Sequence, residues 1–179
     1  MKSFIVTGAS ASGKTTLINT AMQNGYLHLP THTTRSPRIG EIMGVHNIYM
    51  DLDEFKLNFD RGMYFEPNLI YAEKNGVYYG TPRNWIDCLK RENYCATVIT
   101  PFIANIICNY TNVLWIALTC DDSVRKTRLI NRNISKEEVI SRLNTANDQY
   151  NLPPQVRVFD TTFLSPGDIF ERIKELNDV

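Results

Sequence analysis

The sequence predicts an α/β fold in which helices cover both faces of a parallel sheet. Three observations support this prediction. Short apolar, β-branched runs recur along the chain, segments with helical apolar spacing separate them, and a glycine-rich turn joins the first run to the first helix. A parallel strand buried on both faces needs such a continuous apolar run, and a crossover helix must return the chain to start the next strand.

The strands are expected to be short and to form the middle layer. The predicted strands cover residues 3–7, 26–30, 94–100, 113–119 and 156–159, of which 26–30 is a strand or an extended segment. Helices are expected in the stretches between and after them, which gives the alternation typical of parallel sheets.

The helix boundaries follow from apolar spacing and from capping residues. Leu17 begins the apolar face of the first helix, and either Asp51 or Asp53 can cap a second, short helix. Pro82 suits a first helical turn, and Ser135 opens a sequence typical of a capping box. The predicted helices cover residues 14–24, 53–61, 82–92, 102–109, 121–132, a segment from 135, and 166–176.

A single domain is the expected organisation, because 179 residues can bury one adequate core. Residues 31–81 differ from the rest: they are polar, aromatic and rich in turns. We expect them to form a substrate-binding insertion into a core made of residues 1–30 and 82–179. Open α/β sheets bind ligands at the carboxyl ends of their strands, where this insertion is expected.

Composition favours a cytoplasmic protein and gives no support for nucleic-acid or membrane partners. Lys and Arg number 19, as do Asp and Glu, so the formal net charge is +0. No apolar run approaches the ~18 residues of a membrane span, and residues 1–3 leave no room for a signal peptide. The cysteines are widely spaced without a C-x-x-C pair, which favours reduced structural thiols: Cys88, Cys95, Cys108 and Cys120.

The glycine-rich turn fits the pattern G-x-x-x-x-G-K-[ST], which is typical of loops that bind nucleotide phosphates. Its backbone amides can converge on one anion, and the following helix adds its positive end. Lys14 is expected to reach the outer phosphates, and the Thr15 hydroxyl to bind Mg²⁺. The expected nucleotide-binding residues here are Gly8, Ala9, Ser10, Ala11, Ser12, Gly13, Lys14, Thr15 and Thr16.

A second group of polar residues follows in the insertion. Arg35 and Arg38 stand three positions apart, so two guanidinium groups could clamp one phosphate. Further on, residues 62–66 read G-M-Y-F-E and residues 76–81 read G-V-Y-Y-G-T. Taken singly, these segments predict only turns with aromatic packing.

In their order and spacing, these segments resemble the guanylate kinase family: T-T-R-x-P-R-x-G-E-x-x-G, a Phe-Glu pair after a glycine, and Y-Y-G-T. The resemblance implies a P-loop kinase three-layer sandwich with an acceptor-binding insertion and a small lid at about residues 125–142. It also implies ATP, Mg²⁺ and a small-molecule phosphate acceptor. That acceptor is expected to be a nucleoside monophosphate, with GMP or a related purine nucleotide favoured, and we expect the chain to be a monomer or homodimer.

The resemblance also implies roles for individual residues. The acceptor's phosphate is assigned to Arg35, Arg38 and Tyr79, with Glu41 as a carboxylate beside the guanidinium groups. The guanine edge is assigned to Thr31, Glu66 and Thr81. The lid arginines that close over the phosphates are Arg128, Arg132 and Arg142, and Asp160 stands where the family has an asparagine near the adenine.

Four departures from the family pattern leave the acceptor open. The strand over residues 94–100 lacks the family's aspartates. Asn47 stands where the family has a tyrosine, and Tyr49 follows two places on. Arg142 is one residue out of register unless the lid is shortened, and Asp160 replaces the family's asparagine. We therefore also consider a ribosyl bisphosphate or a deoxynucleoside monophosphate as acceptor, and a non-catalytic binding module of the same family.

Overall fold

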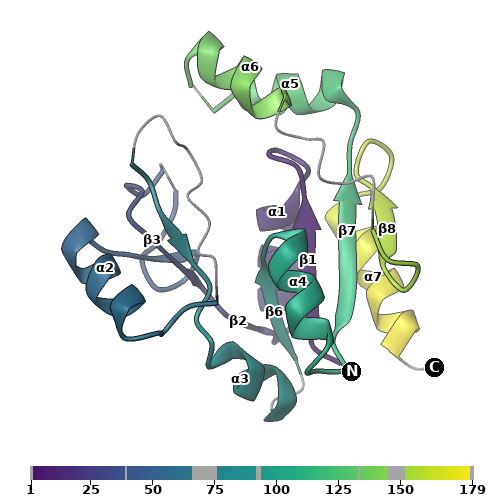
Figure 1. Cartoon of the computed structure of the whole chain (residues 1–179). Coiled ribbons are helices and arrows are strands. Elements are labelled where there is room, and N and C mark those ends of the chain that lie inside the picture. The colour runs from purple at the N-terminus through teal and green to yellow at the C-terminus, as the bar shows by residue number, and fades with distance from the viewer. Residues whose placement is uncertain are drawn as a thin grey trace.

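The main sheet of the computed structural model has five parallel strands in the order β2-β6-β1-β7-β8 (Figure 1). The structure describes residues 2–38, 40–65, 76–91, 94–132, 134–144 and 152–177. The strands are β1 (Phe4–Gly8), β2 (Leu27–His28), β6 (Cys95–Val98), β7 (Leu114–Thr119) and β8 (Arg157–Asp160). The predicted parallel sheet is therefore confirmed, with each strand within a few residues of its expected bounds.

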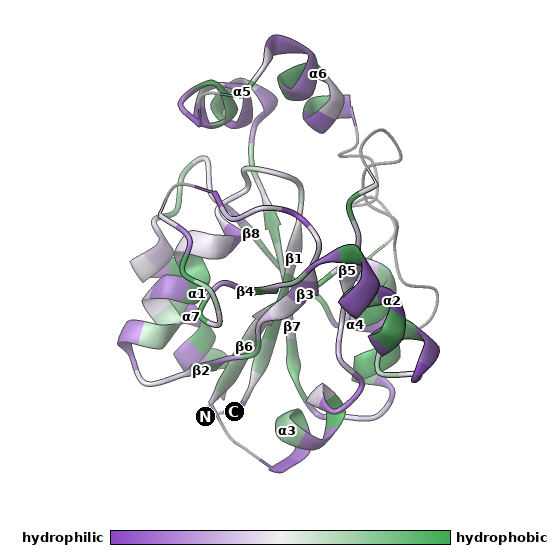
Figure 2. Cartoon of the chain, turned by 90° about the vertical axis from the view of Figure 1, so that its left-hand side faces the viewer, coloured by the Kyte–Doolittle hydropathy of each residue, from purple (hydrophilic) through white to green (hydrophobic). Residues whose placement is uncertain are grey.

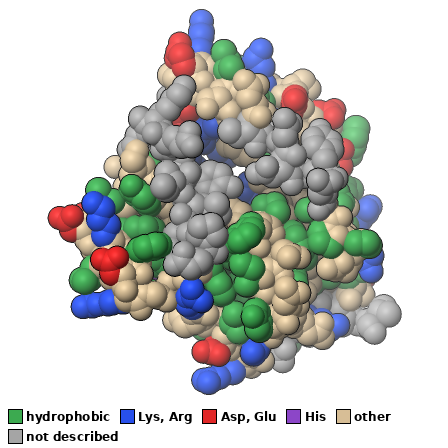
Figure 3. All heavy atoms as spheres, viewed as in Figure 1, with side chains coloured by type: hydrophobic (Ala, Val, Ile, Leu, Met, Phe, Trp, Pro, Cys, Tyr) green, Lys and Arg blue, Asp and Glu red, His purple; other side chains and the backbone are tan. Residues whose placement is uncertain are grey.

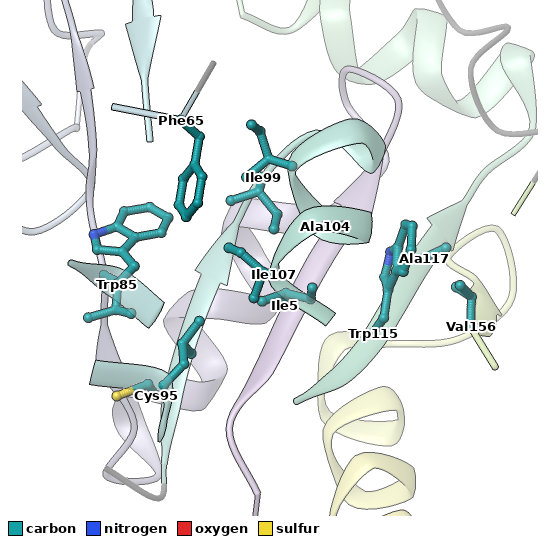
Figure 4. Close-up of a cluster of buried hydrophobic side chains, with 13 residues drawn as sticks. Ile5, Phe65, Trp85, Cys95, Ile99, Ala104, Ile107, Trp115, Ala117 and Val156 are labelled. Atoms are coloured by element: carbon teal, nitrogen blue, oxygen red, sulfur yellow. The ribbon is translucent and has the colours of Figure 1, made fainter. Parts of the chain in front are cut away.

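Helices cover both faces of this sheet. Alternate residues of β1 point to opposite sides: Phe4 and Val6 pack with α1 (Lys14–Gln23) and α7 (Pro166–Asn177). Ile5 packs on the other face, against the side chains of α4 (Pro101–Cys108) such as Ile107 (Figure 4). The helix α3 (Trp85–Arg91) adds Trp85 and Leu89 to that second cluster. This arrangement is a three-layer sandwich.

Two helix starts test the capping predictions. The helix α2 (Leu52–Asp60) begins after Asp51, whose carboxylate accepts a 2.8 Å hydrogen bond from the Glu54 amide as predicted. The prediction that Pro82 lies in the first turn of a helix was wrong, because α3 begins three residues later. Pro82 instead forms an antiparallel bridge with Tyr64, and the neighbouring backbone pairs hold this segment extended.

A small second sheet, which the sequence did not predict, lies beside the β2 edge of the main sheet (Figure 1). Its strands, in the order β4-β3-β5, are β4 (Asn47–Tyr49), β3 (Thr31–Thr33) and β5 (Tyr79–Gly80). Tyr64 supports it, because its fully buried ring stacks on Phe55 at 4.8 Å between centroids. Gly80 is required next to that ring, since a Cβ there would lie 2.8 Å from Tyr64.

Two further helices, α5 (Asp122–Ile130) and α6 (Lys136–Asn144), lie above the carboxyl ends of the strands and over the turn from β1 to α1 (Figures 1 and 2). A small apolar cluster of Ala11, Leu129 and Val139 joins them to that turn. The Ser135 hydroxyl accepts a 3.1 Å hydrogen bond from the Glu138 amide, as the capping prediction requires. Among the described residues, no helix is both long and apolar enough to cross a membrane.

Candidate functional site

The turn between β1 and α1 has the backbone geometry of a phosphate-binding loop. Gly8 and Gly13 have φ values of +148° and +95°, which favour glycine. A Cβ on Gly8 would lie 2.5 Å from the Leu118 carbonyl oxygen, so no side chain fits there. Ala11 also has a positive φ, 65°, and its methyl group is buried against the lid helices. The loop therefore keeps a strained, tightly packed shape that few sequences could adopt.

Side chains hold several of the loop's carbonyl oxygens. The ammonium of Lys14 donates 2.7 Å hydrogen bonds to the carbonyls of Gly8 and Ala9. The Thr161 hydroxyl donates a 3.0 Å hydrogen bond to the Ser12 carbonyl. Turning carbonyl oxygens to one side directs peptide N–H groups to the other, which is the geometry of an anion nest.

The pKa of Lys14 is unusually low for a lysine. Burial, followed by the positive charges of Arg132, Arg125 and Arg38, lowers the pKa of Lys14 to about 7. A lysine surrounded by cations gains most from an incoming anion, because the anion offsets all of these repulsions together. Thr15 and Thr16, the other residues expected here, are exposed at the start of α1.

Glu41 is the centre of the arginine motif in the insertion. Its carboxylate accepts hydrogen bonds from Arg35 Nη2 (2.9 and 3.0 Å) and from the backbone amide of Arg38 (2.7 Å). The hydroxyl of Tyr49 adds a third donor at 2.8 Å. Burial alone would raise the pKa of Glu41, but these donors hold it below its usual range.

The two motif arginines have different surroundings. Arg35 is held by Glu41, by the Tyr79 hydroxyl at 3.1 Å from Nε, and by the Ser36 carbonyl at 2.7 Å from Nη1. Arg38 is the more accessible, with 37% of its side chain exposed against 15% for Arg35, and its Nη1 lies 3.9 Å from Glu41. Arg38 is thus the guanidinium with more capacity for a further anion, while Arg35 organises the cluster.

Two of the three residues expected to read a base, Thr31 and Thr81, lie on or next to the small sheet. Thr31 opens β3 and is half-buried, as is Thr81, which directly follows β5. The carbonyl of Thr81 accepts a 3.1 Å hydrogen bond from the Phe65 amide, which fixes the chain just before Glu66. Glu66 itself lies outside the described residues, so its expected role remains a prediction.

Arg128, on α5 in the segment predicted to form a lid, reaches the turn between β1 and α1. Its Nη1 donates to the Ala11 carbonyl at 3.1 Å and to the Thr161 hydroxyl at 3.0 Å, and its Nη2 donates to the Thr161 carbonyl at 2.9 Å. Nη1 also lies 3.4 Å from the Cys120 sulfur. Arg128 therefore links α5 to the turn between β1 and α1 and to Thr161.

The other two arginines of the predicted lid, Arg132 and Arg142, lie close enough to the insertion to interact electrostatically with its charged residues. Arg142 pairs with Glu138 and lies 3.4 Å from the Ser10 hydroxyl. Burial and then the charge of Arg142 lower the pKa of Arg132. Burial and then the charges of Arg35 and Arg142 likewise lower the pKa of Arg38. Cations from the loop, the insertion and the lid are thus mutual neighbours, and Figure 3 shows Lys and Arg side chains at the hollow beneath α5 and α6.

Carboxylates are scarce on the main-sheet side. The strand β6 has none, and the hydroxyl of its Thr97 is taken by the Leu29 carbonyl at 2.7 Å. Asp160 ends β8, where its carboxylate accepts a 2.8 Å hydrogen bond from the Thr162 amide within the turn. In the parts of the chain that the structure describes, no three His, Cys, Asp or Glu side chains gather into a metal-binding group. All four cysteines are free thiols.

Sequence reasoning missed three residues that shape this site: Tyr49, Arg125 and Thr161. Arg125 and Thr161 bind the loop by hydrogen bonds that join segments far apart in the chain, whereas Tyr49 binds Glu41, eight positions before it. The signal for Tyr49 was a tyrosine two places from its family position, and the signal for Arg125 was its place in a basic cluster with Lys126, Arg128 and Arg132. Nothing in the sequence pattern distinguishes Thr161.

Comparison with known proteins agrees with the resemblance. A family model described as guanylate kinase matches residues 1–178. Guanylate kinase of Cupriavidus metallidurans is 42% identical over 86 residues, which cover 47% of this chain but only 38% of that protein. Guanylate kinase of Chlamydia muridarum is 29% identical over 161 residues, covering 88% of this chain and 70% of that protein.

Solved structures share the fold. The crystal structure of guanylate kinase from Anaplasma phagocytophilum has a TM-score of 0.62 at 19% identity, covering 98% of this chain and 83% of that one. A sugar kinase from Janibacter sp. HTCC2649 has a TM-score of 0.53 at 16% identity, covering 100% and 95%. The expected α/β fold is confirmed, and because the family model covers the chain almost end to end, the chain belongs to the guanylate kinase family.

Proposed function

We propose that this protein is an ATP-dependent phosphotransferase that acts on a nucleoside monophosphate, with GMP or a related purine nucleotide as the first acceptor to test. The products would be the nucleoside diphosphate and ADP. Residues 31–81 would bind the acceptor, and the lid at about residues 125–142 would close over the phosphates.

One observation carries this proposal: the phosphate-binding loop and the arginine motif of the insertion face the same cationic region. The pKa of Lys14 is lowered by burial and by the charges of Arg132, Arg125 and Arg38, and that of Arg38 is lowered in part by Arg142. Anions bound among these cations would offset their mutual repulsion. Two phosphate groups, one on the loop and one beside Arg38, would do so.

Phosphoryl transfer suits this arrangement, because it requires the donor and acceptor phosphates to be aligned, neutralised and shielded from water. In the proposed reaction Lys14 leaves the Gly8 and Ala9 carbonyls to bind the outer phosphates of ATP. Arg38 binds the acceptor phosphate, Arg35 is held in place by Glu41, and Arg132 balances the charge at the transferring group. The protein needs no general base, since the attacking phosphate oxygen is already anionic.

The residues present fit ATP better than they fit a fully protein-bound metal. Gly8 and Gly13 leave no side chain over the loop, and Thr15 begins α1 with an exposed side chain. Mg²⁺, when bound, would offset phosphate charge, with the Thr15 hydroxyl as its protein ligand and phosphate or water oxygens as the others. The strand β6 adds no carboxylate to this set.

That carboxylate-free strand also favours testing acceptors other than GMP. A ribosyl bisphosphate presents no base edge, and a deoxynucleoside monophosphate lacks one hydroxyl. A panel containing GMP, dGMP, AMP and ribose 1,5-bisphosphate, assayed for ADP release with ATP and Mg²⁺, would separate these acceptors. ATP binding without ADP release on any of them would favour the non-catalytic binding module instead.

The reaction itself is tested with Lys14→Ala. This variant should lose turnover by about a hundredfold or more while its melting temperature stays close to that of the unchanged protein. Lys90→Ala, on the exposed side of α3, is the matched control and should keep full activity. Unchanged turnover in Lys14→Ala would contradict the proposed role of the loop.

The purine assignment is tested with Glu66→Gln. If Glu66 reads the guanine edge, the KM for GMP should rise at least tenfold and the KM for ATP should stay within about twofold. An equal rise in both KM values would remove Glu66 from the acceptor site.

A further inference from the structure

Every carbonyl of the phosphate-binding loop from Gly8 to Ser12 accepts a hydrogen bond from a side chain. Lys14 donates to the Gly8 and Ala9 carbonyls, and Thr161 donates to the Ser12 carbonyl. The two carbonyls at the tip of the loop, on Ser10 and Ala11, are held from the lid by arginines. One of these, Arg128, belongs to the expected site; the other, Arg125, does not.

Arg125 is almost completely buried, with 2% of the residue exposed, although it lies on a surface helix. Its guanidinium joins three separate segments. Nε donates to the Ser10 carbonyl at 3.1 Å, Nη2 to the Arg142 carbonyl at the end of α6 at 3.0 Å, and Nη1 to the Asp122 carboxylate at 2.6 Å. A planar guanidinium can make these bonds in fixed directions at the same time, which an ammonium group cannot.

These contacts give Arg125 two connected effects on the site. The bond to Ser10 fixes the peptide at the loop tip, so that its carbonyl points to the lid and the opposite side remains for phosphate. The bond to Arg142 fixes the end of α6, the helix turn that carries a cation facing Arg38. The Ala11 methyl packs with Leu129 and Val139 and so keeps the loop tip in contact with α5 and α6. Apolar packing of this kind is not directional, unlike the hydrogen bonds of Arg125.

We propose that Arg125 is a positioning residue that sets the phosphate-binding loop and the lid in their nucleotide-binding arrangement before nucleotide arrives. It does so without touching the phosphates, because its donors are directed at the Ser10, Arg142 and Asp122 oxygens. This inference rests on the proposed binding of ATP by the loop. It adds a residue outside the phosphate-binding pattern that determines how strongly ATP is held.

The test measures ATP binding by calorimetry, with Mg²⁺, for the full chain and for three variants. Arg125→Ala should weaken ATP binding about tenfold or more, because the guanidinium that bonds both the loop tip and the end of α6 is lost. Arg125→Lys keeps the charge but cannot make the three bonds, so it should remain nearly as weak. Lys126→Ala, the exposed neighbour on α5, should bind ATP as the unchanged protein does.

Chemical rescue separates positioning from simple loss of structure. Guanidinium chloride, at concentrations far below those that unfold proteins, should occupy the space left in Arg125→Ala and restore ATP affinity. Urea, which has a similar shape and no charge, should restore much less. A folded Arg125→Ala variant that binds ATP normally, or binds weakly without rescue, would overturn this inference alone. Failure of the unchanged protein to bind ATP would overturn the proposed function, and this inference with it.

Discussion

The hydroxyl of Tyr49 donates a 2.8 Å hydrogen bond to Glu41 Oε2, the same oxygen that accepts from the backbone amide of Arg38. Tyr49 also stands under Arg35, whose guanidinium carbon lies 5.7 Å from the ring centroid. One tyrosine on β4 therefore supports both parts of the arginine cluster. It does so two positions from where the family pattern expects a tyrosine, and Asn47, at that position, donates to the Tyr49 hydroxyl at 3.3 Å.

Tyr49→Phe should therefore weaken the binding of the acceptor without affecting ATP. Removing one donor to a charged, half-buried carboxylate costs about 1 kcal/mol, or about a fivefold rise in the acceptor KM. Tyr110→Phe, on an exposed tyrosine beyond α4, is the matched control. Steady-state kinetics with each substrate varied in turn gives the answer, and a rise confined to the KM for ATP would contradict this role.

The fold was largely predictable because its main elements carry strong local signals. β1 and β7 are continuous apolar runs, and α2 begins at a recognisable cap, Asp51. The small sheet was not predictable, since β5 has two residues and β3 has three. Strands of this length are too short to show alternation, and pairing between segments distant in sequence determines them.

The site, like the fold, has one part that could be predicted from the sequence and one part that could not. The loop from Gly8 to Thr15 is one continuous segment, so its pattern is visible in the sequence. Thr161 and Arg125 reach that loop across 149 and 115 positions, and only the folded chain brings them together. The sequence pattern also assigns equal roles to Arg35 and Arg38, whereas the structure shows that Glu41 and Tyr79 already engage Arg35.

ATP affinity should fall as the pH rises above 7. In the free protein, the pKa of Lys14 is about 7, and a bound phosphate would raise it. Below pH 7 Lys14 is protonated in both states, so affinity is at its full value. Above pH 7 the free protein must take up a proton to bind, and affinity falls up to about tenfold per pH unit until the higher pKa is passed.

Calorimetry in buffers of different ionisation enthalpy, from about pH 7.5 to about pH 9, measures this proton uptake directly. Lys14→Arg is the control, because an arginine stays protonated throughout this range and its profile should be flat. ATP binding with no proton uptake in the unchanged protein would show that Lys14 keeps its charge without nucleotide.

Glu41→Gln should reduce the stability of the protein at neutral pH but hardly at all in acid. The folded-state pKa of Glu41 lies below its usual range, so its contribution is complete above the unfolded-state value and is lost as the pH falls through the lower one. Because the group is only partly shielded from water, we expect about 1 kcal/mol or less. Urea unfolding of both proteins between about pH 6 and about pH 3.5 should show the difference shrinking. A constant difference across that range would contradict the prediction.

Ser12→Ala should make the protein more stable. The Ser12 hydroxyl is completely buried and, within the described part of the chain, has no hydrogen-bond partner. An unsatisfied buried hydroxyl costs about 1–3 kcal/mol, and alanine removes it without opening a large space. For a chain of this size the melting temperature should rise by about 2–4 °C per kcal/mol. Ser123→Ala, at the exposed start of α5, removes a hydroxyl that water can satisfy and should change the free energy of unfolding by less than about 0.5 kcal/mol. A melting temperature that stays the same or falls in Ser12→Ala would mean that this hydroxyl is satisfied inside the loop.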